Sequence, residues 1–139
     1  MAMGTSVSPI RRSEAITRGY RVAVEPRYLS NESDPHMRKY VFAYRITITN
    51  ADGVPAQLMS RRWRIVDAHG RESEVVGDGV IGATPHLSSG EVFTYESYCP
   101  LPTPWGTMEG SYTMQDATGE RFDIAVPRFY LVCREGPNS

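Results

Sequence analysis

Apolar and polar residues alternate in several short runs of this chain, and this spacing constrains its fold more than any other feature. The first two runs are apolar at every second position, at Tyr20, Val22 and Val24 and then at Phe42, Tyr44, Ile46 and Ile48. Successive side chains of a β-strand point to opposite faces, so a period of two predicts strands with one buried face. No run has a convincing helical period.

Further alternating runs follow, and turn residues separate them. They span residues 58–67, 71–76, 92–98, 107–115 and 120–126, with Asp-Ala-His-Gly at 67–70 and Asp-Ala-Thr-Gly at 116–119 as tight turns. The total is seven or eight short strands. We therefore predict an all-β fold, an antiparallel β-sandwich whose two sheets bury their alternating faces against each other. In the run at 58–67, Trp63 is expected in the core, with Arg62 and Arg64 on the opposite face.

The length of 139 residues suits a single domain with its own core. Residues 1–18 lack periodicity and are expected to form a mobile N-terminal tail, followed by the domain at 19–133 and a C-terminal tail at 134–139. The net charge of -1 provides no field that would attract nucleic acid. No apolar run is long enough for membrane insertion, and no export segment begins the chain, so we expect a cytoplasmic protein with Cys99 and Cys133 reduced.

The glycine-rich stretch at residues 77–82 reads GDGVIG and matches the pattern GxGxxG. In dinucleotide-binding folds this pattern needs a strand before it and a helix after it, because the helix N-terminus binds the pyrophosphate. Pro85 and Gly90 leave no room for a helix here, so the favoured interpretation is a bulged crossing between sheets. At such a crossing the glycines would allow a positive φ or a close backbone approach. The alternative is an anion site built from the amides of Gly77, Asp78, Gly79 and Gly82.

Arg62 and Arg64 are the best candidates for an additional anion contact, because both point to the same side of their strand. A solvated outer sheet face is the simpler explanation. The nearby Glu72 and Glu74 also share a face, where mutual repulsion could raise a pKa, although an exposed hairpin face explains them equally well.

Neither a metal site nor an active site is apparent in the sequence. His36, His69 and His86 lie on three different loops without paired ligands, so we expect no metal and no cofactor. No GxSxG motif marks a serine nucleophile. These features predict a protein without enzymatic activity.

Beyond these patterns, the sequence resembles a known family. The run at 77–82, followed by Pro85, Leu87, Gly90-Glu91 and the stretch from Gly106 to Met114, resembles the bacterial ApaG proteins, as does Leu58 to Trp63 upstream. The resemblance spans residues 18–133 and implies an immunoglobulin-like sandwich of the fibronectin type III kind. Ser88-Ser89 and Tyr98-Cys99-Pro100 depart from the family pattern at loop positions.

The resemblance implies a binding or adaptor module, because the same domain occurs in eukaryotic F-box proteins and in a polymerase-interacting protein. The family label of cobalt and magnesium efflux implies a link to divalent-cation tolerance. A frequent neighbouring gene for a diadenosine-tetraphosphate hydrolase implies that a nucleotide or pyrophosphate ligand is the alternative. We expect an unidentified protein partner, and unpaired edge strands also offer a route to a homodimer.

Overall fold

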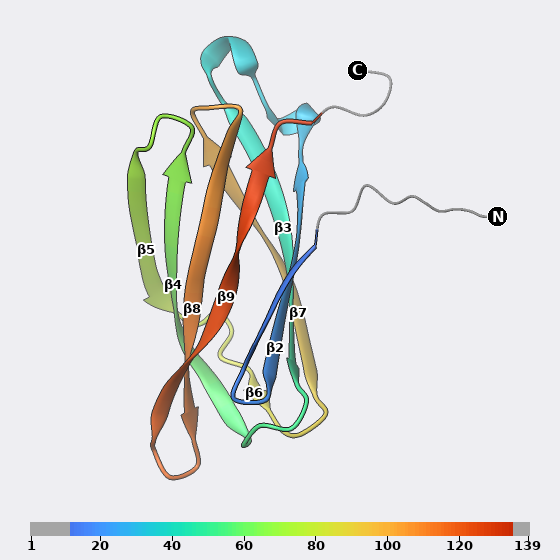
Figure 1. Ribbon diagram of the computed structural model, residues 1–139, viewed down its shortest axis with the longest axis vertical. Coiled ribbons are helices and arrows are strands. Elements are labelled where there is room, and N and C mark those ends of the chain that lie inside the picture. Colours follow the sequence, from blue (N-terminus) through green and yellow to red (C-terminus); the bar gives the residue numbers. More distant parts are fainter. Residues whose placement is uncertain (1–11, 135–139) are drawn as a thin grey trace, which may run out of the picture.

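The computed structural model describes residues 12–134, and nine strands in that range form two sheets (Figure 1). Two 3-10 turns, η1 (Ser30–Glu32) and η2 (Pro35–Met37), join the second strand to the third. The strands are β1 (Ser13–Thr17), β2 (Tyr20–Tyr28), β3 (Tyr40–Asn50), β4 (Ala56–Asp67), β5 (Glu72–Asp78), β6 (His86–Leu87), β7 (Val92–Leu101), β8 (Trp105–Asp116) and β9 (Arg121–Val132).

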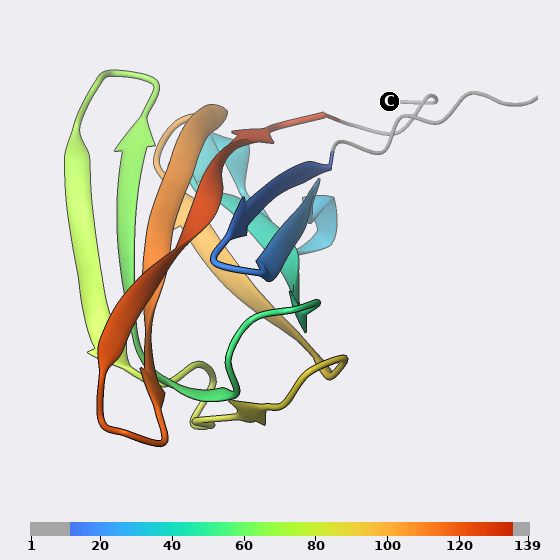
Figure 2. The ribbon, with the colours of Figure 1, turned by 60° about the horizontal axis from the view of Figure 1, so that its bottom comes forward.

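The two sheets are antiparallel and lie face to face, as Figure 2 shows, which confirms the predicted sandwich. One sheet has the strand order β1-β2-β3-β7 and the other β5-β4-β8-β9, with β6 pairing to β4. The hairpins expected at residues 67–70 and 116–119 join β4 to β5 and β8 to β9.

The sequence did not predict two of the strands, β1 and β6. The strand β1 lies inside residues 1–18, which we expected to form a mobile tail, yet it pairs with β2 from Ser13 to Thr17. Strand β1 has no fully buried residue, so it is held by backbone pairing and has no apolar face that a sequence pattern could reveal. The strand β6 has two residues, too few to display a period. Residues 1–11 and 135–139, the remainder of the expected tails, lie outside the described residues.

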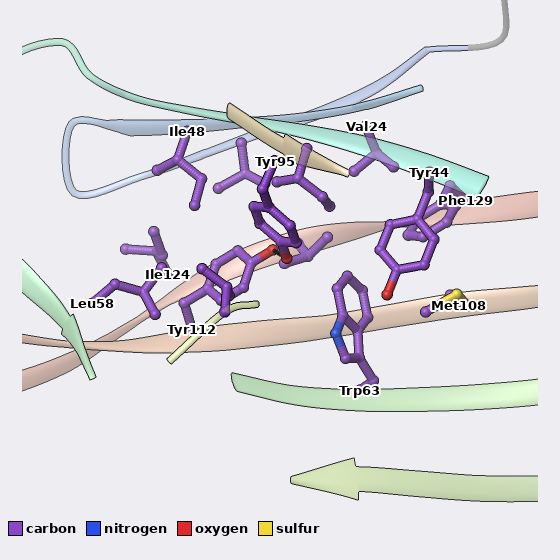
Figure 3. Close-up of a cluster of buried hydrophobic side chains, with 14 of the residues drawn as sticks. Val24, Tyr44, Ile48, Leu58, Trp63, Tyr95, Met108, Tyr112, Ile124 and Phe129 are labelled. Atoms are coloured by element: carbon purple, nitrogen blue, oxygen red, sulfur yellow. Dashed lines mark hydrogen bonds between the residues drawn. The ribbon is translucent and has the colours of Figure 1, made fainter. Parts of the chain in front are cut away.

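The core lies between the inner faces of the two sheets, where the alternating residues of β2 and β3 are fully buried. Trp63 is 3% exposed and confirms its predicted place in the core. Its ring centroid lies 5.5 Å from that of Tyr44, 5.9 Å from Phe129 and 6.3 Å from Tyr112 (Figure 3). Edge-to-face contacts of this kind add to the hydrophobic stabilisation.

A β-bulge interrupts the pairing of β4 with β8 between Leu58 and Ser60. Met59 is the extra residue, so Leu58 and Trp63 both face the core although five positions separate them. After the bulge, Arg61 is on the same side of β4 as Trp63, whereas Arg62 and Arg64 are on the outer side. The bulge therefore turns one arginine toward the space between the sheets.

The sandwich is closed along one side and open along the other. On the closed side, β9 packs against β1 and β2, and the Ala125 amide donates to the Thr17 hydroxyl at 3.2 Å. The opposite edges are β5 and β7. In Figure 2, β5 lies on the side of the molecule away from β1. All residues of β5 except Gly77 are exposed, so its outer edge is available for backbone pairing.

Candidate functional site

The glycine-rich loop leaves the end of β5 and turns back against β4. The Gly79 amide donates to the Met59 carbonyl at 2.8 Å, and Val80 and Ala83 exchange two amide-to-carbonyl bonds of 2.8 Å each. Gly79 and Gly82 have φ values of +60° and +79°, which confirms the expected positive φ. A Cβ at Gly79 would also collide with the Ala83 carbonyl.

The loop is not a dinucleotide-binding turn, because irregular residues follow it and β6 then begins at His86. Its position corrects one detail of the sequence interpretation. The loop connects β5 to β6, which both pair with β4, so it stays within one sheet. The chain crosses to the other sheet only after Leu87. Glycine is needed here for a tight return along β4 and not for a crossing.

Arg61 is the residue whose side chain binds the loop, and the sequence analysis did not single it out. Its Nη1 donates to the carbonyls of Asp78 and Gly79, at 2.9 Å each. The guanidinium lies flat against Gly77, where a Cβ would be 2.8 Å from Nη1 and 2.9 Å from Cζ. The loop therefore presents carbonyl oxygens to a cation, whereas the sequence suggested amides presented to an anion. The available signal was the period of two, which groups Arg61 with buried Trp63.

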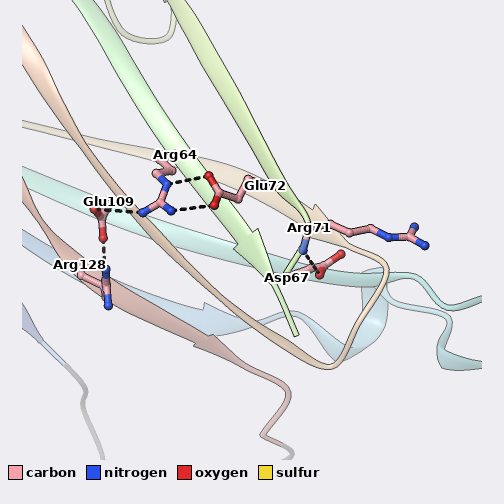
Figure 4. Close-up of polar contacts among 6 residues, drawn as sticks. All are labelled: Arg64, Asp67, Arg71, Glu72, Glu109 and Arg128. Carbon is pink, nitrogen blue, oxygen red and sulfur yellow. Dashed lines mark hydrogen bonds and ion pairs between the residues drawn. The ribbon is translucent and has the colours of Figure 1, made fainter. Parts of the chain in front are cut away.

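Arg62 and Arg64 lie on the outer face of the sheet, as the simpler sequence interpretation expected. Arg64 donates to both carboxylate oxygens of Glu72, at 3.0 and 2.8 Å. Its Nη1 also lies 3.8 Å from Glu109, which accepts a bond of 2.6 Å from Arg128 (Figure 4).

This ion-pair ladder crosses all four main strands of its sheet. Arg62 forms a weaker pair with Glu74 at 3.9 Å. The bonds from Arg64 lower the pKa of Glu72, so the suggested increase from carboxylate repulsion is wrong for this residue. The two arginines are therefore balanced by carboxylates and do not converge with Asp78 and the glycines on one anion.

A groove of about 490 Å³ lies between the edge strands β5 and β7. Its walls are mostly apolar, with Trp63 and Met108 from the sheet of β5 and Tyr98 and Leu101 from β7. Arg61 and Val75 also line it, together with the charged residues Asp67, Arg71 and Glu72. Tyr98-Cys99-Pro100, expected at a loop position, lie within the strand β7. Tyr98 is 60% exposed and Val75 39% exposed, so the groove opens to solvent along its rim.

Neutral hydroxyl and thiol groups lie in and behind this groove. Burial raises the pKa of Tyr44, although a hydrogen bond with Ser97 partly offsets that effect. Burial likewise raises the pKa of the Cys99 thiol to about 11. Deeper in the core, the hydroxyls of Tyr95 and Tyr112 are 2.5 Å apart and bond to each other (Figure 3). These groups are protonated at neutral pH, so none of them is an activated nucleophile.

Between residues 12 and 134, no three His, Cys, Asp or Glu side chains gather where they could hold a metal ion. His36 lies in η2, His69 in the turn after β4 and His86 in β6, so the three imidazoles are dispersed as the sequence indicated, although His86 is in a strand and not in a loop. Cys99 and Cys133 are both free thiols. The helical segments of the described region are single 3-10 turns, and none could cross a bilayer.

Comparison with known proteins agrees with the sandwich and with the resemblance seen in the sequence. The ApaG domain family matches residues 30–116. Protein ApaG of Methylobacterium sp. (strain 4-46) is 53% identical over 118 residues, which cover 85% of this chain and 91% of that protein. Protein ApaG of Rhizobium meliloti (strain 1021) is 49% identical over 117 residues, covering 84% of this chain and 90% of the relative.

A solved structure extends the agreement to three dimensions. The crystal structure of a protein from Bordetella pertussis described as ApaA is 43% identical in sequence and superposes with a TM-score of 0.77. The match covers 91% of this chain and 97% of that chain. Identity at this level over nearly the whole domain, together with the same two-sheet architecture, shows that this chain belongs to the ApaG family.

Proposed function

We propose that this protein is a binding module without enzymatic activity, which holds a segment of a partner protein in the groove between β5 and β7. The observation that carries the proposal is the open side of the sandwich. There an apolar groove lies beside a strand, β5, whose outer edge is unpaired in the described structure. An extended segment could bond to such an edge through its backbone and place side chains in the groove.

The state of the ionisable groups supports a binding role over a catalytic one. Catalysis needs a base or nucleophile whose pKa is close to the working pH. In the groove, the tyrosine and cysteine pKa values move away from neutrality. Near the rim of the groove, the Glu72 carboxylate already accepts two bonds from Arg64 in the ion-pair ladder. The groove therefore offers shape and apolar contact without an activated group.

A nucleotide or pyrophosphate ligand at residues 77–82 has less support. The amides of Gly79 and Val80 donate to carbonyls of the protein, and Arg64 already binds two carboxylates. A link to divalent-cation tolerance would then act through the partner and not through a bound ion. The proposed location of the module and its partner is the cytoplasm.

A pair of neighbouring substitutions on β5 tests the proposal. Val75 lines the groove, whereas Val76 points to the other face of the strand. Val75→Asp places a charge in the apolar groove, and Val76→Asp makes the same chemical change outside it. We expect affinity purification at natural abundance to recover a stoichiometric partner with the wild type and with Val76→Asp, and to lose it with Val75→Asp.

Two results would contradict the proposal. One is the absence of any stoichiometric partner for the wild-type protein. The other is a partner that Val75→Asp retains as well as Val76→Asp does, since that partner would bind elsewhere. Circular dichroism of both variants shows whether the fold is intact, because Asp is unfavourable in strands.

A further inference from the structure

Arg61 is the one arginine of β4 without a carboxylate partner in the described structure. Arg62 pairs with Glu74 and Arg64 with Glu72 and Glu109, but no carboxylate of residues 12–134 lies within 4.0 Å of Arg61. The side chain of Arg61 is half-buried and lines the groove. A partly desolvated cation without a counter-charge is costly unless an anion or water satisfies it.

The local geometry leaves part of the guanidinium available to a ligand. Nη1 is used by the carbonyls of Asp78 and Gly79, and in the described structure Nε and Nη2 have no protein acceptor. These two nitrogens carry three of the five donors of the group. Contact with Gly77 and the two carbonyl bonds fix the plane of the guanidinium, so little rotamer entropy would be lost on binding.

We propose that the segment bound in the groove presents a carboxylate to Arg61 and an apolar side chain to the wall formed by Trp63 and Tyr98. This inference rests on the proposed function, because it specifies the chemistry of the same partner. A planar guanidinium matches a carboxylate through paired bonds. The groove carboxylates of Asp67 and Glu72 already accept bonds from within the protein, so the unpaired charge of Arg61 favours an acidic segment over a basic one. The unpaired edge of β5 favours an occupant that has a peptide backbone.

Selection from a phage-displayed library of random 12-residue peptides on the full chain supplies the probe. We expect enrichment of peptides in which an Asp or Glu lies next to apolar residues. Calorimetry with an enriched synthetic peptide then compares the wild type with Arg61→Met and with Arg62→Met. The second variant removes the same charge from the neighbouring position on the outer face, and it is the matched control.

We expect Arg61→Met to weaken binding by about thirtyfold or more, and Arg62→Met by no more than about twofold. Arg61→Lys keeps a positive charge without the planar fork, so its binding should be intermediate. If Arg61→Met does not fold, the inference is tested by peptide binding to Arg61→Lys, together with peptide titrations of the wild type at about 50 mM and about 500 mM salt. Equal binding by Arg61→Lys at an affinity that salt does not change would overturn the inference.

The outcomes separate this inference from the proposed function. Enriched peptides that lack acidic residues, bind Arg61→Met normally and lose binding to Val75→Asp would overturn the carboxylate contact and leave the groove as the binding site. If no peptide is enriched, or if the enriched peptides bind Val75→Asp and the wild type equally, both proposals fail.

Discussion

The hydrogen bond between Tyr95 and Tyr112 allows a quantitative test of how the core is held. The two residues are 5% and 0% exposed, and their hydroxyls, 2.5 Å apart, bond to each other. Replacing either tyrosine with phenylalanine leaves the other hydroxyl buried without its partner. We therefore expect Tyr95→Phe and Tyr112→Phe each to lower the free energy of unfolding by about 1–3 kcal/mol, the cost of an unsatisfied buried polar group.

The double variant provides the decisive comparison. It removes both hydroxyls and leaves two apolar rings of similar shape, which is close to neutral for stability. Its loss of stability should therefore be smaller than the sum of the two single losses by nearly that whole sum, about 2–6 kcal/mol. With a urea dependence of about 1–3 kcal/mol per molar, each single variant should lower the unfolding midpoint by roughly 1 M.

Urea unfolding followed by tryptophan fluorescence measures all four proteins. Strictly additive losses would refute the reasoning, because they would mean that each hydroxyl finds another partner when its neighbour is removed. An altered urea dependence in one variant would show a change in the unfolded state and would require a separate probe.

The same pair predicts a dependence on alkaline pH. Burial raises the pKa of both tyrosines above the usual value near 10, so the folded protein keeps protons that the unfolded chain releases. Their contribution to the free energy of unfolding is fully present below about pH 10. It is lost as the pH rises toward the folded-state pKa values, at up to about 1.4 kcal/mol per pH unit for each tyrosine. The double phenylalanine variant should show a shallower decline between about pH 10 and 11.

Three further predictions concern the surface and the thiols. Arg64→Met should lower the unfolding midpoint slightly in dilute buffer and by less in about 1 M salt, because salt screens the exposed pairs with Glu72 and Glu109; an equal effect in both buffers would contradict this role for the ladder. Cys99 is buried with its pKa raised to about 11, so a thiol reagent at neutral pH should label Cys133 first and Cys99 only on unfolding; equal labelling rates in the Cys99→Ser and Cys133→Ser variants would oppose this. Light scattering over increasing concentration tests the homodimer suggested by the unpaired edges, and a constant monomer mass would remove it.

The sequence predicted most of the fold because the strands that make the core have one apolar face each. Tyr44 and Ile46 are buried at the alternating positions where the pattern placed them, and the turn at 67–70 joins β4 to β5 as expected. Strand β1 was missed because its contribution is backbone pairing, which leaves no mark in the order of apolar residues. Pairing of this kind depends on a distant partner, here β2.

The candidate site was less predictable, since it depends on which atoms of a residue face the space between the sheets. The glycine pattern marked the loop, but a sequence does not show that the carbonyls of Asp78 and Gly79 point toward Arg61. Arg61 was overlooked beside Arg62 and Arg64, although the three differ only in the face of β4 that they occupy. To tell Arg61 from the other two arginines, one must know how β4 pairs with β5 and where Gly77 lies.

The additional residue at Met59 divides β4 into two halves of opposite parity. Even-numbered positions face inward before it, as at Ala56 and Leu58, and odd-numbered positions after it, as at Trp63 and Asp67. Removal of Met59 would leave Leu58 and Trp63 four positions apart, a spacing at which a regular strand turns both side chains to the same face, so both would stay in the core. A one-residue gap placed elsewhere in β4 would assign the residues between that gap and Met59 to the wrong face, so comparisons within the family should be anchored separately on each side of residue 59.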